Sequence, residues 1–117
     1  MREIKFKAWN KVKKEMILFD NFYELQKWNR SKKELLYFEL IQYIGLKDKN
    51  GKMIYEGDIV KTSEIESEVG EVVWDEERAM FKIYVDIIPQ DFGLTEIENL
   101  EIIGNIYENK ELLKTNE

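Results

Sequence analysis

Two turn signals close together, between residues 42 and 61, constrain the fold of this chain more than any other stretch. The first begins at Asp48 and ends in Asn50-Gly51, a dipeptide that tolerates the positive φ angles of a tight hairpin turn. In the second, Gly57 can adopt a left-handed conformation, and the Asp58 carboxylate can accept a hydrogen bond from a nearby backbone N–H. Short apolar runs flank both turns, so the stretch predicts a hairpin followed by a new strand.

The sequence after this stretch is typical of a small antiparallel barrel. A strand opens at Ile59, and a hairpin is predicted from the apolar runs 69–74 and 79–86, the second of which alternates between two faces. Pro89 is expected to end that hairpin, since proline cannot donate to the ladder. An acidic exposed loop is expected at 62–68 and a connection without a strand at 90–99. A last strand is predicted at 100–107.

The segment before residue 42 is predicted to form a β-hairpin and a short helical part. Apolar and polar residues alternate in 3–9, and a second strand follows at 16–19. Two pairs have the spacing of a capping box, Asn21 with Glu24 and Ser31 with Glu34. In such a box the side chain of the cap residue accepts the backbone N–H of the residue three positions later, and the side chain of that residue accepts the backbone N–H of the cap. The nearly continuous apolar run 35–41 could be a buried helix or a buried strand, and we favour a strand over 38–44.

The length of 117 residues allows one domain, or a barrel with an N-terminal extension. We therefore divide the chain into residues 1–38, a hairpin and connecting segment, and residues 39–117, an antiparallel barrel. Asn109 is expected to cap a terminal helical turn. Apolar residues make up 44% of the chain, which suffices for a core. The expected fold class is mainly β with minor α.

The residue inventory excludes several kinds of chemistry. The chain contains neither cysteine nor histidine, so it has no disulfides, no cysteine nucleophile, no zinc finger and no histidine general base. No apolar run approaches the roughly 20 residues that span a bilayer, and no signal peptide is evident. We expect a protein of the cytoplasm without a membrane partner.

Charge is distributed unevenly along the chain. Residues 1–33 carry ten Lys and Arg against four Asp and Glu, whereas residues 34–117 carry eight against twenty. One interpretation is a basic binding surface for nucleic acid, for an acidic partner or for the acidic part of another copy. The other is a solvated lysine-rich hairpin beside an acidic barrel. The candidate surface consists of Arg2, Lys5, Lys7, Lys11, Lys13 and Lys14.

Five aromatic residues also admit two interpretations. They could form a stacking platform for single-stranded nucleic acid, or they could fill the core and the interface between hairpin and barrel. We favour the core, since the acidic barrel would repel phosphates within a Debye length of roughly 8 Å. The residues are Phe6, Trp9, Tyr43, Tyr55 and Trp74.

No catalytic, metal or cofactor site is predicted, and we expect no enzyme activity. The glycines Gly45 and Gly51 before Lys52 are spaced one residue too far apart for a phosphate-binding loop, and a calcium loop would need a ligand where Lys52 stands. Glu56 and Asp58 could form a carboxylate pair or a magnesium site, but turn capping by Asp58 explains the same residues. We interpret six residues as structural turn positions: Asp48, Asn50, Gly51, Gly57, Asp58 and Gly104.

Three blocks carry a family resemblance, at residues 2–9, 42–61 and 103–109. In combination, Gly-Leu-Lys-Asp-Lys-Asn-Gly-Lys at 45–52 and Tyr-Glu-Gly-Asp-Ile-Val at 55–60 resemble the YopX family of bacteriophage and prophage proteins of Gram-positive bacteria. Two departures are visible: Lys110 stands where many relatives have proline, and residues 20–38 match nothing alignable. The resemblance implies a C-terminal barrel of the SH3-like type with a smaller N-terminal part, and almost nothing about activity.

Three functions remain as hypotheses. The leading one is a non-enzymatic accessory protein of a phage, acting as a protein-binding or regulatory module, with itself as a possible partner in a homo-oligomer. The second is a nucleic-acid-binding module using the basic hairpin, whose affinity would fall steeply with salt. The third is a carboxylate-dependent hydrolase or nuclease, which we consider the weakest.

Overall fold

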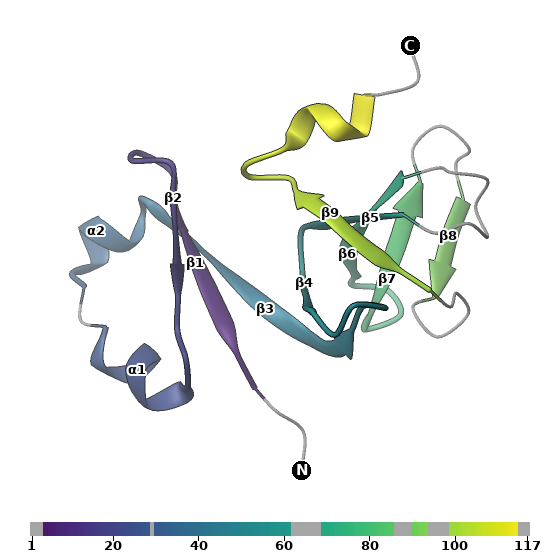
Figure 1. Cartoon of the computed structure of the whole chain (residues 1–117). Helices are drawn as coiled ribbons and strands as arrows, with labels where there is room; N and C mark the ends of the chain where they lie inside the picture. Colours follow the sequence, from purple (N-terminus) through teal and green to yellow (C-terminus); the bar gives the residue numbers. More distant parts are fainter. Residues whose placement is uncertain (1–3, 29, 62–68, 86–89, 94–98, 115–117) are drawn as a thin grey trace.

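The computed structural model describes residues 4–28, 30–61, 69–85, 90–93 and 99–114, which form two antiparallel sheets (Figure 1). The strand order is β2-β1-β3-β4 in the first sheet and β8-β7-β6-β5-β9 in the second. Within those described ranges three short helices accompany the sheets, so the predicted mainly β class is confirmed. Among the described residues, no helix has the length and apolar character needed to cross a membrane.

The first sheet consists of β1 (Phe6–Asn10), β2 (Glu15–Leu18), β3 (Phe38–Lys47) and β4 (Met53–Tyr55). The second sheet consists of β5 (Asp58–Lys61), β6 (Val69–Asp75), β7 (Met80–Val85), β8 (Gln90–Gly93) and β9 (Glu101–Asn105). The helices are α1 (Phe22–Lys27), α2 (Lys32–Leu35) and the 3-10 helix η2 (Lys110–Lys114).

The N-terminal hairpin has the predicted strands and a tight turn. β1 pairs with β2, with Ala8 opposite Ile17. The Asn10 side-chain oxygen accepts hydrogen bonds from the backbone N–H groups of Val12 and Lys13, both at 3.0 Å. Because these bonds hold the backbone of the turn against Asn10, the hairpin tip at residues 11–14 is a defined loop.

Both predicted capping residues begin a helix. The Asn21 side chain accepts the Glu24 N–H at 2.9 Å at the start of α1. At the start of α2, Ser31 and Glu34 each accept the other's backbone N–H, the reciprocal arrangement of a capping box. Both caps satisfy donors that the first helical turn leaves without partners, but only the cap of α2 is a complete capping box.

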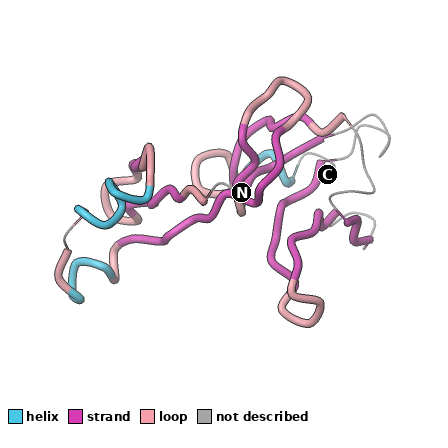
Figure 2. Tube along the Cα trace, turned by 90° about the horizontal axis from the view of Figure 1, so that it is seen from below, coloured by secondary structure: helices cyan, strands magenta, loops and turns pink. Residues whose placement is uncertain are grey.

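The long strand β3 belongs to both halves of the molecule (Figures 1 and 2). Its first half pairs with β1, from Phe38 opposite Asn10 to Gln42 opposite Phe6. Its second half pairs with β4, and the register shifts between Tyr43 and Lys47. The strand predicted over 38–44 is thus present. The boundary that we predicted between residues 38 and 39 falls at its start and stays a prediction.

Two buried clusters form the core. The first lies in the second sheet and contains Val60, Val72, Ile83 and Val85, with Ile54 and Leu100. The second consists of Trp9, Ile41, Tyr43 and Tyr55, with Met16, Met53 and Tyr107 packed against it. This aromatic cluster draws on β1 and β3 of the first sheet and on the segment after β9. It therefore ties the hairpin to the rest of the chain.

The segment predicted as a connection without a strand contains β8. It pairs with β7 through residues 90–93 and 82–85. The prediction was wrong because local propensity around Gly93 is weak, whereas the outer backbone groups of β7 need hydrogen-bond partners. Pro89 and the acidic stretch 62–68 lie outside the described residues.

Two further predictions about termini and turns need correction. The terminal helical turn predicted after Asn109 is present as η2, and the Asn109 carbonyl accepts the Leu112 N–H at 2.9 Å. The Asn109 side chain, however, accepts the N–H of Asn105 at 3.2 Å. Its Cβ packs against Gly104, and that contact turns the side chain back toward β9. In the β3–β4 turn only Gly51 has positive φ, at 83°, while Asn50 does not. The Asp48 carboxylate, which accepts the Asn50 and Lys52 N–H groups, holds that turn instead.

Candidate binding cleft

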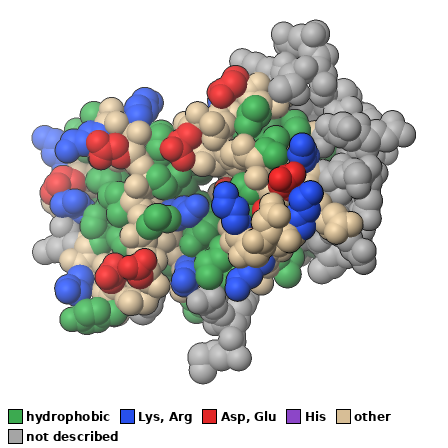
Figure 3. All heavy atoms as spheres, viewed as in Figure 1, with side chains coloured by type: hydrophobic (Ala, Val, Ile, Leu, Met, Phe, Trp, Pro, Cys, Tyr) green, Lys and Arg blue, Asp and Glu red, His purple; other side chains and the backbone are tan. Residues whose placement is uncertain are grey.

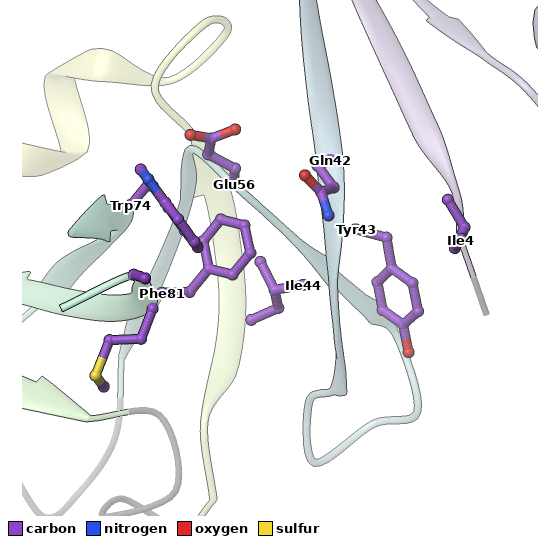
Figure 4. A pocket seen from close by; sticks show the side chains of 9 residues that line it. Ile4, Gln42, Tyr43, Ile44, Glu56, Trp74 and Phe81 are labelled. Atoms are coloured by element: carbon purple, nitrogen blue, oxygen red, sulfur yellow. The ribbon is translucent and has the colours of Figure 1, made fainter. Parts of the chain in front are cut away.

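A cleft of about 540 Å³ lies between the two sheets (Figure 4). On one side are Trp74 at the end of β6 and Phe81 on β7; on the other are Gln42 and Ile44 of β3. Glu56, from the turn between β4 and β5, lies beside Trp74. The remaining lining residues are Ile4, Tyr43, Ala79 and Met80.

The aromatic side of the cleft is built by a cross-strand pair. Trp74 and Phe81 are opposite each other in the β6–β7 register. Their ring centroids are 4.9 Å apart at an interplanar angle of 67°, an edge-to-face arrangement. Trp74 is nevertheless 44% exposed. An aromatic ring held in place but open to solvent is a surface suited to contact with another molecule.

The turn beneath Trp74 and Phe81 is held by ion pairs. The Asp75 carboxylate lies 3.3 Å from the Lys82 Nζ and accepts the Glu77 and Arg78 N–H groups. Desolvation alone would raise the pKa of Asp75, but the backbone donors and the Lys82 ammonium group together lower it. Ala79 closes the turn with φ of 52°. The turn therefore fixes the strands that carry Trp74 and Phe81.

Glu56 is the charged group of the cleft. Its backbone N–H donates to the Gln42 carbonyl at 2.9 Å, which places its side chain beside β3. Partial burial, and then the nearby charge of Glu39, raise the pKa of its carboxyl group. Within the described part of the chain, no lysine or arginine nitrogen lies within 4.0 Å of this carboxylate.

Several carboxylates, Glu56 among them, act on the hydroxyl of Tyr107. Burial raises the pKa of the Tyr107 hydroxyl, and the charges of Glu39, Glu56, Glu71 and Asp58 raise it further. Tyr107 also packs its ring 5.8 Å from Trp9. This aromatic junction between the sheets therefore sits in a negative field, which favours a cation as a neighbour.

The cleft combines an open aromatic pair, aliphatic side chains, a carboxamide and a carboxylate that has no cationic partner among the residues the structure describes. That combination suits a positively charged side chain with an aliphatic stem, which can donate to the carboxylate and lie over an aromatic face. Among the described residues, no group of three or more Asp and Glu side chains is arranged to hold a metal ion.

The predicted basic residues do not form one surface. Lys11, Lys13 and Lys14 lie together on the exposed hairpin tip. Lys7 points elsewhere, with its Nζ 4.1 Å from the centre of the Tyr55 ring. Lys5 directly precedes β1, where its carbonyl accepts the Tyr43 N–H, and Arg2 is outside the described residues.

The two carboxylates weighed as a catalytic pair line different pockets. Glu56 lines the cleft, whereas Asp58 lines a pocket of about 260 Å³ with Lys7 and Lys52. The Asp58 carboxylate accepts the Tyr55 N–H at 2.8 Å, which is turn capping. Burial raises its pKa to about 6, and this hydrogen bond and the charge of Lys7 oppose the rise.

The remaining turn residues hold strands together. Asp48 also accepts the Ile102 N–H at 3.1 Å and so joins the β3–β4 turn to β9. Gly57, with φ of 88°, donates to the Val72 carbonyl and accepts from the Ile106 N–H. A side chain at Gly57 would meet the Tyr107 ring.

The aromatic residues divide between core and surface. Trp9, Tyr43 and Tyr55 are buried, as the core interpretation requires, and Phe6 is partly buried. Trp74 is exposed at the cleft. Sequence reasoning missed Gln42, Ile44, Met80 and Phe81 as cleft residues. No local signal could have found them, because the cleft exists only where two sheets meet.

Comparisons with known proteins give a family match and a similar solved structure. A family profile described as "YopX protein" matches residues 5–114. A crystal structure of protein EF1440 from Enterococcus faecalis is similar, with a TM-score of 0.62 and 25% sequence identity. The similarity covers 97% of this chain and 99% of that one. No curated protein matches the chain.

Proposed function

This chain belongs to the YopX family, and on that premise we propose that it is a phage- or prophage-encoded accessory protein that binds protein partners through the inter-sheet cleft. It acts in the cytoplasm of a bacterial host, self-associates and catalyses no reaction. The observation that carries this proposal is the cleft itself, where an ordered but 44% exposed Trp74 stands beside Phe81 and Glu56.

The rim of the cleft supports binding to a protein. Ile4 is 52% exposed and Met80 is 39% exposed, so apolar surface continues outward from the aromatic pair. An aromatic centre with apolar neighbours and a charged rim has the composition of a protein-binding hot spot. A volume of about 540 Å³ accommodates a few side chains of a partner.

We further propose that the second sheet is an SH3-like barrel. Strands β5 to β8 form a continuous meander, and β9 returns to pair with β5. That order places the last strand beside the first, as in small five-stranded barrels. The cleft would then lie on the outside of this barrel, at the place where the β6–β7 hairpin of the barrel faces β3.

Capture of partners by the tagged protein tests the proposal. A partner bound through the cleft should be recovered by the wild-type chain and lost by Trp74→Ala. The matched control is Tyr37→Ala, since Tyr37 is 45% exposed but does not line the cleft. Equal recovery by Trp74→Ala and the wild type, with both folded by circular dichroism, would contradict the cleft as the binding site.

A nucleic-acid-binding function is the second candidate, and the exposed hairpin tip favours it. Lys11, Lys13 and Lys14 project from one short turn, and Figure 3 shows basic side chains on that half of the molecule. This function predicts binding of single-stranded or duplex DNA that weakens steeply between about 50 and 200 mM salt. Salt-independent capture of a protein would favour the first candidate instead.

A further inference from the structure

We propose that the cleft of one copy receives the hairpin tip at residues 11–14 of a second copy, so that identical chains associate head to tail. The inference rests on the proposed self-association and assigns the two surfaces that make it. The tip supplies the cationic side chains, and the cleft supplies Glu56 and the Trp74 and Phe81 rings.

The hairpin tip carries the positive charges that can pair with the carboxylate of the cleft. Its sequence is Lys-Val-Lys-Lys, with no acidic residue, and Val12 is 66% exposed. A lysine can donate to the Glu56 carboxylate while its stem lies along an aromatic ring, and Val12 can cover the apolar rim. The opposite charges of residues 1–33 and 34–117 draw the tip of one copy toward the acidic half of another.

The tip is also preformed. Two bonds to the Asn10 side chain, and a third from the Lys14 N–H to the Asn10 carbonyl at 2.8 Å, fix its backbone. Lys14 adopts φ of 58° to complete the turn. A rigid loop loses little conformational entropy when it binds, so a small contact can still be effective.

A chain cannot place its tip in its own cleft. The β1–β3 register sets Asn10 opposite Phe38 at one end and Phe6 opposite Gln42 at the other. The tip follows Asn10, whereas Gln42 lines the cleft, so the two surfaces lie at opposite ends of this strand pair (Figure 1). Each copy therefore keeps a free tip and a free cleft, and association forms a closed ring or an open chain.

Charge exchange between two variants tests the assignment. We expect Lys11→Glu/Lys13→Glu, and separately Glu56→Lys, to raise the self-association constant Kd about tenfold or more in sedimentation velocity. A mixture of the two should recover association with the variants in alternation, because the unaltered tip meets the unaltered cleft and the acidic tip of the first variant meets the Glu56→Lys cleft, both with opposite charges. Lys32→Glu/Lys33→Glu changes charge equally on α2 and should leave Kd unchanged.

The outcomes separate this inference from the proposed function. If the wild-type chain self-associates and the tip variant does so equally well, the assignment is wrong but self-association stands. If the wild-type chain is monomeric at about 100 µM, both fail. Equal weakening by the α2 variant would show that net charge, not docking, governs association. If Glu56→Lys does not fold, Glu56→Gln replaces it as the cleft variant. A Kd of Glu56→Gln equal to that of the wild-type chain would overturn the assignment.

Discussion

The Asp48 carboxylate accepts a hydrogen bond from the backbone N–H of Ile102, 54 residues later in the chain, at 3.1 Å. Its other oxygen accepts the Asn50 and Lys52 N–H groups, both at 2.9 Å. One side chain thus closes the turn between β3 and β4 and attaches it to β9. Because Asp48 is buried, no water can easily replace it as the acceptor.

Asp48→Asn should lower the free energy of unfolding by about 1–3 kcal/mol, because the amide presents one acceptor oxygen where two are used. Urea denaturation followed by tryptophan fluorescence measures this loss. Asp20→Asn is the control at an exposed position and should change stability little. A loss no larger than that of the control would mean that the bond to Ile102 contributes nothing.

Asp58 should make the chain less stable as pH rises from about 4 to about 7. Its pKa in the folded chain is about 6, above the ordinary 3.8, so folding favours the protonated form. Its contribution is fully present below the ordinary pKa and is lost as pH rises through the folded pKa. The effect is at most about 3 kcal/mol.

The variant Asp58→Asn isolates this contribution. It keeps an oxygen for the Tyr55 N–H but cannot ionise. The difference in unfolding free energy between the variant and the wild type should therefore shift in favour of the variant from about pH 4 to about pH 6 and stay constant above that. A difference that is constant from pH 4 to 8 would contradict the raised pKa.

Lys7→Met should raise the pKa of Asp58 further, because the Lys7 charge lowers it in the wild-type chain. The loss of stability should be larger at pH 8 than at pH 4.5, where Asp58 is protonated in either protein. Titration of the Asp58 carboxyl carbon by NMR measures the pKa directly. Lys13→Met removes an equal charge from the hairpin tip, and the same shift in that variant would refute a local effect of Lys7.

Gly57→Ala should destabilise the chain by more than Gly51→Ala. Both glycines have positive φ, 88° and 83°, so both substitutions carry a backbone strain of about 1–2 kcal/mol. The new methyl group has open space at Gly51, but at Gly57 it would lie 2.9 Å from the Tyr107 ring. Thermal unfolding of the two variants measures the difference, and equal melting temperatures would show that Tyr107 moves aside freely.

The sequence by itself determined the local elements of this protein. The alternation in the N-terminal hairpin, the capping pairs at Asn21 and Ser31, and the glycine turns at Gly51 and Gly57 all act over a few residues. Hydrogen bonding and backbone sterics at such short range are set by residue type. These features predicted a mainly β chain, and the family resemblance predicted the membership that the profile match shows.

Only the tertiary structure decided which elements meet. Strand β8 forms because β7 offers it an edge, and Asn109 turns away from its helix because Gly104 leaves room beside it. The cleft arises where β3 passes the β6–β7 hairpin, so Gln42 and Phe81 become neighbours across 39 positions of sequence. Such contacts depend on how two sheets pack, and packing depends on the whole set of buried side chains, which no local pattern specifies.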